Sequence, residues 1–281
     1  MRIIQPSIKQ NLKWNKNEVQ NNILKHISLS KSKGFDKITH IVWSESAIPY
    51  IVKSEGLFLK ELDSLLPNKI LITGGIRAES NGNKIEKLYN SIFLIKDSKV
   101  LNYYDKVHLV PFGEYIPFRK FIPFVSKITH GSMDFSSGLK AKTIKLNDET
   151  LFSPLICYEV IFSEKVVDYN NMPDIIVNLT NDGWFGKSTG PRQHFDNAKL
   201  RAVENGISVV RVANNGISAI IDGYGRVQNK LKTNEIGFLD VSVSKKINIF
   251  LYKKNKIILG ILSLYIVAIF LSKSDFIKNY F

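Results

Sequence analysis

Short apolar runs alternate with amphipathic stretches along the first part of this chain. Arg2–Gln5, Ile38–Trp43 and Ile70–Gly74 have the length and apolar character of strands. Between them, Asn17–Leu29 and Ile51–Leu66 carry aliphatic residues at helical spacing. Because helices separate the strands, the pattern predicts buried strands of a sheet with helices packed on it.

The middle of the chain changes to a hairpin and a long irregular segment. Leu88–Ile95 and Val100–Tyr104 are apolar runs on either side of Asp97 and Ser98, which predicts two antiparallel strands joined by a tight turn. Residues Lys106–Gly138 are rich in Pro, Gly and Phe. Irregular segments of that length inside a compact domain are usually functional.

Strands and helices alternate again in the second half. Leu151–Cys157 and Ile175–Leu179 are apolar strands, and a loop with Gly and Trp follows at Thr180–Gln193. The remaining elements are helices predicted at Val160–Tyr169 and His194–Asn205, and strands predicted at Ser208–Ala213 and Ser218–Ile221. Residues 1–245 are therefore predicted to form an α/β layered sandwich.

The C-terminal segment is apolar all round. Ile257–Leu271 contains no charged residue, and Lys256 and Lys273 flank it. At about 1.5 Å per residue it falls somewhat short of a hydrocarbon core about 30 Å thick, and snorkelling lysines make up the difference. We predict a basic linker over 246–256, a transmembrane helix over 257–272 and a tail over 273–281. The alternative is a buried C-terminal core helix, which the lack of a polar face makes the second choice.

Composition narrows the classes of function. The 281 residues carry 39 Lys and Arg against 25 Asp and Glu, a formal charge of +14. The lysines are spread singly rather than gathered into a stripe, which argues against a nucleic-acid partner and fits solubility or an anionic membrane surface. The single cysteine excludes an internal disulfide. The five histidines show no metal-ligand spacing, so we expect no metal and no other cofactor.

Three predicted strand ends offer residues that together carry chemistry. Cys157, Glu45 and Lys106 each lie at or just beyond the end of an apolar strand. Singly, each has an ordinary explanation, because a lone cysteine is more often structural and charged loop residues are usually solvated. Functional side chains in α/β folds, however, gather at strand ends on one edge. A thiol nucleophile needs a base, and a tetrahedral intermediate needs a fixed positive charge, so the trio predicts covalent catalysis by Cys157.

Long motifs surround these three residues. They are Trp43–Pro49, Tyr104–Pro117, Ile156–Glu159, Asn178–Gly186, Gly190–His194 and Asn214–Gly216. In this order they resemble the nitrilase (carbon–nitrogen hydrolase) superfamily and, within it, the apolipoprotein N-acyltransferase branch. The resemblance runs from about residue 1 to 245 and extends to the C-terminal apolar helix. Several long motifs in one order are more specific than any single pattern.

The resemblance implies a nitrilase-like α-β-β-α sandwich and a role for each candidate. Cys157 is implied as the nucleophile, Glu45 as the general base and Lys106 as the oxyanion stabiliser. The reaction implied is acyl transfer through a thioester. A phospholipid donates the acyl chain to the cysteine, and the N-terminal amine of a diacylglyceryl-cysteine lipoprotein accepts it.

The same motifs imply supporting residues. Glu114 is implied as a second glutamate that positions the site, and Tyr158 and Glu159 as residues that line it. Trp184 and Phe185 are implied to belong to a mobile loop that faces lipid. An exposed aromatic loop suits a lipid substrate and is costly for an enzyme of small polar substrates.

The resemblance also implies a location, and it leaves alternatives open. The family works at the bacterial inner membrane with its catalytic domain in the periplasm. Its members carry several transmembrane helices before that domain, whereas this chain begins at the predicted first strand, so a separate chain supplying those helices stays open as a partner. Lysines are denser before the C-terminal apolar segment than after it, which by the positive-inside rule favours the opposite orientation. A membrane-anchored amidase and an inactive remnant are the alternative functions.

Overall fold

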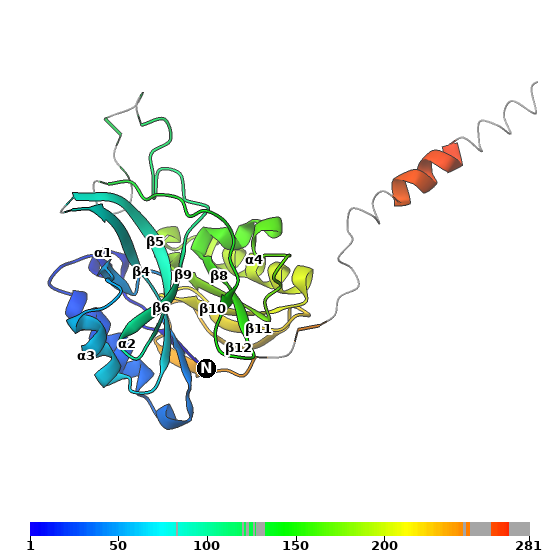
Figure 1. Cartoon of the computed structure of the whole chain (residues 1–281). Coiled ribbons are helices and arrows are strands. Elements are labelled where there is room, and N and C mark those ends of the chain that lie inside the picture. The colour runs from blue at the N-terminus through cyan, green and yellow to red at the C-terminus, as the bar shows by residue number, and fades with distance from the viewer. Residues whose placement is uncertain are drawn as a thin grey trace, which may run out of the picture. The chain divides into compact units, whose positions relative to one another are not determined.

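A computed structural model describes most of the chain as two compact units, residues 1–246 and 247–281. The described residues are 1–82, 84–119, 121, 124–125, 127, 133–243, 246–247 and 260–269. The first unit contains two β-sheets with helices on their outer faces (Figure 1). Each unit is described by itself below.

The first sheet has seven strands among the described residues. Its order is β13 (Gly237–Asp240), β1 (Arg2–Gln5), β2 (His40–Val42), β4 (Ile70–Asn81), β5 (Lys84–Lys96) and β6 (Lys99–Asp105), with β3 (Ile48–Ile51) also paired to β4. β1, β2 and β4 run parallel, whereas β4, β5 and β6 form an antiparallel meander. The ends of β2 and β6 therefore point to the same edge of the sheet.

The second sheet has six strands in the described part of the chain. Its order is β12 (Val227–Leu231), β11 (Ser218–Ile221), β10 (Ser208–Ala213), β9 (Ile175–Thr180), β8 (Leu151–Ile156) and β7 (Ile144–Lys145). The three central strands β8, β9 and β10 are parallel and pair in continuous register. Their carboxyl ends consequently lie side by side and carry the segments that follow each strand.

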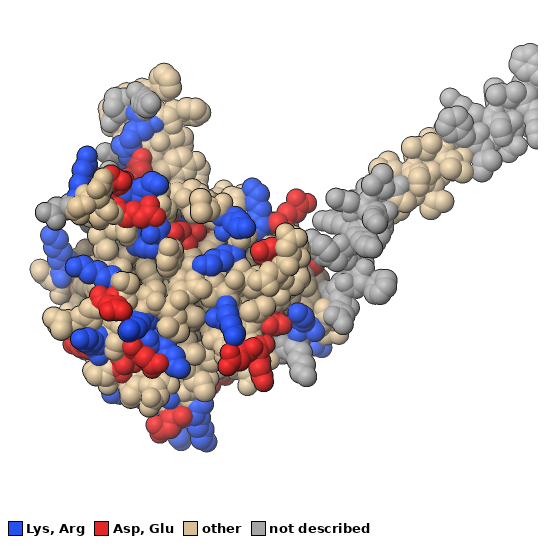
Figure 2. Space-filling view, viewed as in Figure 1, with Lys and Arg blue, Asp and Glu red and all other residues tan. Residues whose placement is uncertain are grey.

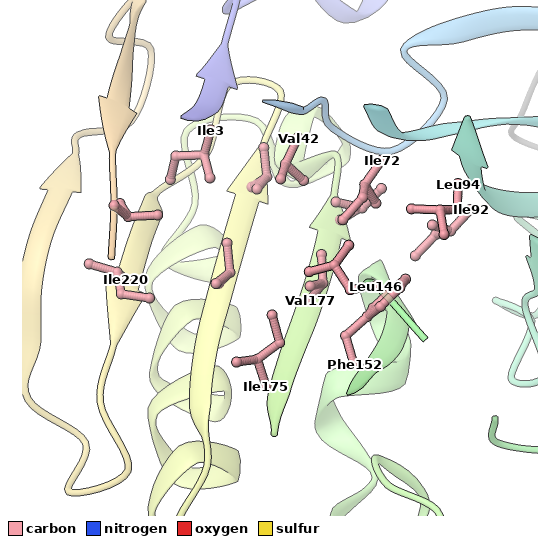
Figure 3. Packing of buried hydrophobic residues seen from close by; sticks show 14 of the residues in the cluster. Ile3, Val42, Ile72, Ile92, Leu94, Leu146, Phe152, Ile175, Val177 and Ile220 are labelled. Atoms are coloured by element: carbon pink, nitrogen blue, oxygen red, sulfur yellow. The ribbon is translucent and has the colours of Figure 1, made fainter. Parts of the chain in front are cut away.

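The core lies in three layers. Between the sheets, Ile3 and Val42 pack with Val177 and other apolar residues of the second sheet, as Figure 3 shows. The helices α2 (Val19–Ser30) and α3 (Leu57–Leu65) cover the outer face of the first sheet, and α4 (Gly190–Asn205) covers that of the second. Buried apolar area of this extent supplies the main favourable term of folding. The predicted α/β sandwich is confirmed.

Several predicted elements match closely, and the hairpin shows why. β5 and β6 are joined by Asp97 and Ser98, which both adopt positive φ (50° and 62°). Two successive left-handed residues match the twist of a tight hairpin. β1, β10 and β11 have the predicted bounds, because their apolar runs are short and closed by polar residues.

One predicted helix begins later than expected, and another is wrong. The helix predicted at Ile51–Leu66 begins only at Leu57, because Ile48–Ile51 pairs with β4 and Gly56 precedes the helix. The helix predicted at Val160–Tyr169 is replaced by two 3-10 turns, η2 (Cys157–Ile161) and η3 (Ser163–Lys165). Phe162 between them is extended, and the β-branched residues around it favour such a break.

The second unit contains one described helix, over residues 260–269. Ser263 Oγ donates to the main-chain oxygen of Gly260 within it (2.8 Å). Over the residues that the structure describes, no helix combines the length and hydropathy needed to cross a bilayer. The rest of the predicted 257–272 segment lies outside the described residues, so the transmembrane helix stays a prediction.

Surface charge follows the expectation from sequence. On the face shown in Figure 2, Lys and Arg side chains are interspersed with Asp and Glu rather than gathered into one stripe. On this face the charges are mixed, in keeping with the single spacing of the lysines along the sequence.

Candidate active site

Cys157 follows β8 in a strained turn. It is the first residue of η2, its φ is +48°, and only 8% of it is exposed. A left-handed conformation at a residue with a side chain costs about 1–2 kcal/mol, and such residues cluster at functional sites. The sharp turn from strand to η2 presents the thiol at the carboxyl edge of the second sheet.

Glu45 lies in the turn after β2, where Ser46 also has positive φ (48°). The turn packs on Gly74 of β4, whose hypothetical Cβ would lie 2.4 Å from Ser46 N and 2.7 Å from Glu45 Cα. A glycine inside a strand often marks such a close approach of two backbones. The absence of a side chain at Gly74 therefore allows the Glu45 turn to pack directly against β4.

Gly74→Ala is expected to displace the Glu45 turn. Because backbone atoms occupy the space of the new methyl group, we expect a loss of about 1–3 kcal/mol of stability and a slower reaction at Cys157. Thermal unfolding and alkylation of the thiol by iodoacetamide measure the two effects. Gly237→Ala is the control, because its Cβ would meet Leu231 at an ordinary 3.4 Å. An unchanged Tm and rate in Gly74→Ala would contradict this account.

Lys106 follows β6 and is the best-paired cation of the site. Its side chain is 1% exposed, and its Nζ lies 2.9 Å from Glu114 Oε2 and 3.7 Å from Glu45 Oε1. Burial would lower the pKa of Lys106, but the charges of Glu114 and Glu45 outweigh it and hold that pKa well above its ordinary value. The ammonium is therefore a permanent positive charge at neutral pH.

Asn90 on β5 joins the two carboxylates, a role that no sequence pattern indicated. Its Nδ2 donates to Glu45 Oε1 (2.9 Å) and to Glu114 Oε1 (2.8 Å). Glu114 Oε2 also accepts from the main-chain N–H of Val110 (2.8 Å). The amide thereby fixes the separation of two like charges around Lys106.

Glu159 does not face the cavity; its carboxylate instead accepts hydrogen bonds from two separate segments of the chain. Its Oε1 accepts from Tyr104 Oη and the N–H of Val107 (both 2.7 Å), and its Oε2 accepts from the N–H of Ile156 (2.8 Å). Burial raises the pKa of Glu159, although these hydrogen bonds oppose it. The carboxyl group connects the segment after Lys106 with the strand before Cys157.

Glu45, Lys106 and Cys157 line one cavity of about 830 Å³. Tyr158 and Glu114 line it too, and aliphatic residues such as Ile76, Leu88 and Val110 form much of its wall. Trp184 and Phe185 of η4 (Asp182–Phe185) also border it and are 43% and 40% exposed. The structure thus brings every predicted site residue to the cavity except Glu159.

Lys13 is a second buried lysine that the sequence analysis missed. It is 4% exposed, and its Nζ donates to the main-chain oxygen of Glu45 (2.6 Å). Burial lowers the pKa of Lys13 to about 8, against the opposing influence of Glu45 and Cys157. In the sequence it is one of 39 basic residues, so only its position in space distinguishes it.

The thiol is held in its protonated form at rest. Burial and the charge of Glu45 raise the pKa of Cys157 to about 12, although Lys106 opposes the shift. A thiol is a poor nucleophile until it loses its proton. The arrangement therefore suits a reaction in which a neighbouring base takes the proton as the sulfur attacks.

The rate of Cys157 alkylation is expected to keep rising at pH values at which an ordinary thiol is already fully ionised. The raised pKa leaves little thiolate at pH 8, and the fraction grows as pH approaches 12. Iodoacetamide alkylation from pH 6 to 10, followed by intact mass, measures this profile at the single cysteine. The urea-unfolded chain is the control and should level off near pH 9. A plateau below pH 9 in the folded chain would contradict the expectation.

The described residues contain no cluster of three or more His, Cys, Asp or Glu side chains arranged to hold a metal ion. The cavity is lined by a thiol, two carboxylates and an ammonium group, from Cys157, Glu45, Glu114 and Lys106. These groups can deprotonate a nucleophile, form a covalent intermediate and stabilise an oxyanion.

Comparison with known proteins supplies the family. Residues 2–247 match the family model described as carbon-nitrogen hydrolase. The chain belongs to the carbon-nitrogen hydrolase family. The superfamily predicted from the motifs is confirmed, and the match covers both sheets of this carbon-nitrogen hydrolase.

The branch predicted within the family is also supported by named relatives. The chain is 43% identical over 250 residues to the apolipoprotein N-acyltransferase of Rickettsia typhi, a match that covers 88% of the chain and 50% of the relative. It is 46% identical over 255 residues to that of Rickettsia bellii, with the same coverage. The chain spans about half the length of these curated relatives.

Solved structures agree on the fold. A carbon-nitrogen hydrolase superfamily protein of Xanthomonas campestris superposes with a TM-score of 0.56 at 14% identity, covering 86% of this chain and 89% of that one. An amidase of the nitrilase superfamily from Nesterenkonia gives 0.55 at 18% identity, covering 85% and 88%. At these identities the likeness concerns the fold alone.

Proposed function

We propose that the chain performs apolipoprotein N-acyltransferase chemistry, in which a phospholipid acyl chain passes to the N-terminal amine of a diacylglyceryl-cysteine lipoprotein. The observation that carries the proposal is the placement of Cys157, Glu45 and Lys106 on one largely apolar cavity of about 830 Å³. A cavity of this size and character suits an acyl chain. The relatives named apolipoprotein N-acyltransferase support the same reaction.

The first step forms a thioester. Glu45 takes the thiol proton while Cys157 Sγ attacks the ester carbonyl of the phospholipid, and the ammonium of Lys106 stabilises the oxyanion. The carbon–oxygen bond then breaks, and the proton on Glu45 passes to the departing lysophospholipid oxygen. Low polarity around the site strengthens the help from Lys106, since water does not screen its charge.

The second step transfers the acyl chain. The acceptor amine attacks the thioester carbonyl, the carbon–sulfur bond breaks, and the proton lost by the amine returns to the sulfur through Glu45. Splitting the transfer into two steps lets one cavity serve both substrates in turn. Glu114 and Asn90 hold Lys106 and Glu45 in place throughout.

Exposed aromatic residues support a lipid substrate. Phe118, Phe121 and Phe124 are 78%, 81% and 83% exposed, and Trp184 and Phe185 border the cavity. Large apolar side chains exposed to water are costly unless lipid or a partner covers them. We extend the proposal to the inner membrane, with the catalytic domain over 1–245 facing the periplasm, a linker over 246–256, a membrane helix over 257–272 and a tail over 273–281. A separate chain with further transmembrane helices is included as a partner.

Intact mass spectrometry tests the proposal. The wild-type chain in phospholipid vesicles is expected to gain one acyl group that hydroxylamine removes, and Cys157→Ala is expected to gain none. A synthetic diacylglyceryl peptide should then discharge the wild-type chain. Turnover of simple amides without acylation of Cys157 would support the amidase. Absence of both reactions, also in native bacterial membranes, would support the inactive remnant.

A further inference from the structure

A buried polar cluster lies next to the nucleophile, and its His194 borders the same cavity as Cys157. The cluster contains Asp182 of η4, His194 of α4 and Arg211 of β10, which are 2%, 5% and 0% exposed. Ionisable side chains are seldom buried this deeply unless they are paired. The cluster has no part in the proton transfers described above.

His194 contacts the backbone of Cys157. Its Nε2 lies 3.0 Å from the main-chain oxygen of Cys157, and because that oxygen only accepts, the Nε2–H donates. Within the described part of the chain, the ring is hydrogen-bonded to this oxygen and not to the sulfur. His194 is therefore placed to hold the nucleophile and not to deprotonate it.

The carbonyl oxygen that accepts from His194 belongs to Cys157, whose backbone is strained. Cys157 has φ of +48°, and a buried carbonyl oxygen needs a hydrogen-bond partner. The imidazole supplies that partner from a different element, α4. The bond therefore stabilises the left-handed turn that directs the thiol.

Asp182 and Arg211 orient the imidazole. Asp182 Oδ1 lies 2.8 Å from His194 Nδ1, and Arg211 Nη2 lies 2.9 Å from Asp182 Oδ2 and 3.2 Å from His194 Nδ1. Because Asp182 Oδ1 and the Cys157 oxygen both only accept, His194 bonds to both when each ring nitrogen carries a proton; with a proton on Nε2 alone, Nδ1 accepts from Arg211. Burial would raise the pKa of Asp182, but Arg211 and His194 outweigh it and hold that pKa below its ordinary value. Gly216 makes room for the carboxylate, because a Cβ there would lie 1.9 Å from Asp182 Oδ2.

The other side of His194 faces the aromatic loop. The rings of Phe185 and His194 meet edge to face with centroids 5.8 Å apart, and Phe185 also borders the cavity. One imidazole thus contacts a residue at the cavity wall, the Asp182 carboxylate and the backbone of the nucleophile.

We propose that His194 is a positioning residue, which maintains the left-handed backbone of Cys157 through its Nε2–H and so keeps the thiol beside Glu45 and Lys106. The inference takes from the proposed function only that Cys157 is the nucleophile. It assigns no proton transfer to His194.

A pair of amide variants separates this role from simple packing. The amide nitrogen of Gln reaches about as far as Nε2 of His, whereas that of Asn reaches only as far as Nδ1. His194→Gln is therefore expected to keep the bond to the Cys157 oxygen, and His194→Asn to lose it. We expect iodoacetamide alkylation at pH 9 to fall about tenfold in His194→Asn and to stay within about threefold of wild type in His194→Gln.

Controls make the outcome decisive. His40→Asn changes a histidine of β2 that does not line the cavity, and thermal unfolding reports the stability of each variant. If the alkylation rate falls equally in His194→Asn and His194→Gln, the proposal is overturned in favour of packing or a proton-transfer role. If both variants alkylate at the wild-type rate, the proposal is overturned outright. Since alkylation needs no phospholipid, failure to acylate wild-type Cys157 would count against the proposed function alone.

Discussion

Lys106→Met is expected to lower the rate of acyl-enzyme formation by about 10³-fold. Loss of one oxyanion donor costs about 10²–10³ in rate, and loss of a nearby positive charge raises the pKa of Cys157 further. Intact mass over time measures the rate. Lys60→Met on the exposed face of α3 is the matched control and should react like wild type.

The same substitution should also destabilise the fold, and a second change separates the two effects. Removing the cation leaves the Glu114 carboxylate buried without its partner at 2.9 Å, at a cost of about 3–5 kcal/mol. Adding Glu114→Gln to Lys106→Met should recover part of the Tm without restoring acylation. Recovery of acylation in the double variant would show that Lys106 acts only by stabilising the fold.

Glu45→Gln is expected to slow acyl-enzyme formation by about 10²–10⁴-fold, because the amide cannot take the thiol proton. The Gln oxygen can still accept from Asn90 Nδ2, so the geometry should be preserved. Glu61→Gln on α3 is the control, since that glutamate is exposed.

Alkylation should respond in the opposite direction. The charge of Glu45 contributes to the raised pKa of Cys157, so its removal should lower that pKa and speed alkylation at pH 9–10. A variant that alkylates faster but acylates more slowly has lost a base and kept its nucleophile. Parallel losses in both reactions would instead indicate a displaced turn.

The three proposed catalytic residues could be predicted from the sequence more readily than the residues that surround them. Glu45, Lys106 and Cys157 were found because each follows an apolar run and lies within a long motif. Strand ends can be read from a sequence, since apolar runs have clear limits. β2 and β6 run in the same direction in the first sheet and so place Glu45 and Lys106 at one edge, and Cys157 follows β8 of the second sheet.

Apart from Glu114, the residues that hold the trio could not be found in this way. Asn90 is inside a strand, Lys13 is in a short helix, and His194 is on a helix whose start was predicted four residues late. Each is a common residue type in a regular helix or strand, and its role depends on which group it contacts in the folded protein. Only the three-dimensional arrangement reveals such pairings.

The tie made by Glu159 determines how the cavity can admit a substrate. One carboxyl group binds the N–H of Ile156 in the second sheet and both Tyr104 and Val107 at the end of β6 in the first. Sliding or parting of the sheets at this edge would break these three hydrogen bonds at once. The proposed lipid substrate would therefore enter by movement of side chains and loops at the cavity rim, and a small electrophile that needs no such movement should reach Cys157 at a rate independent of membrane composition.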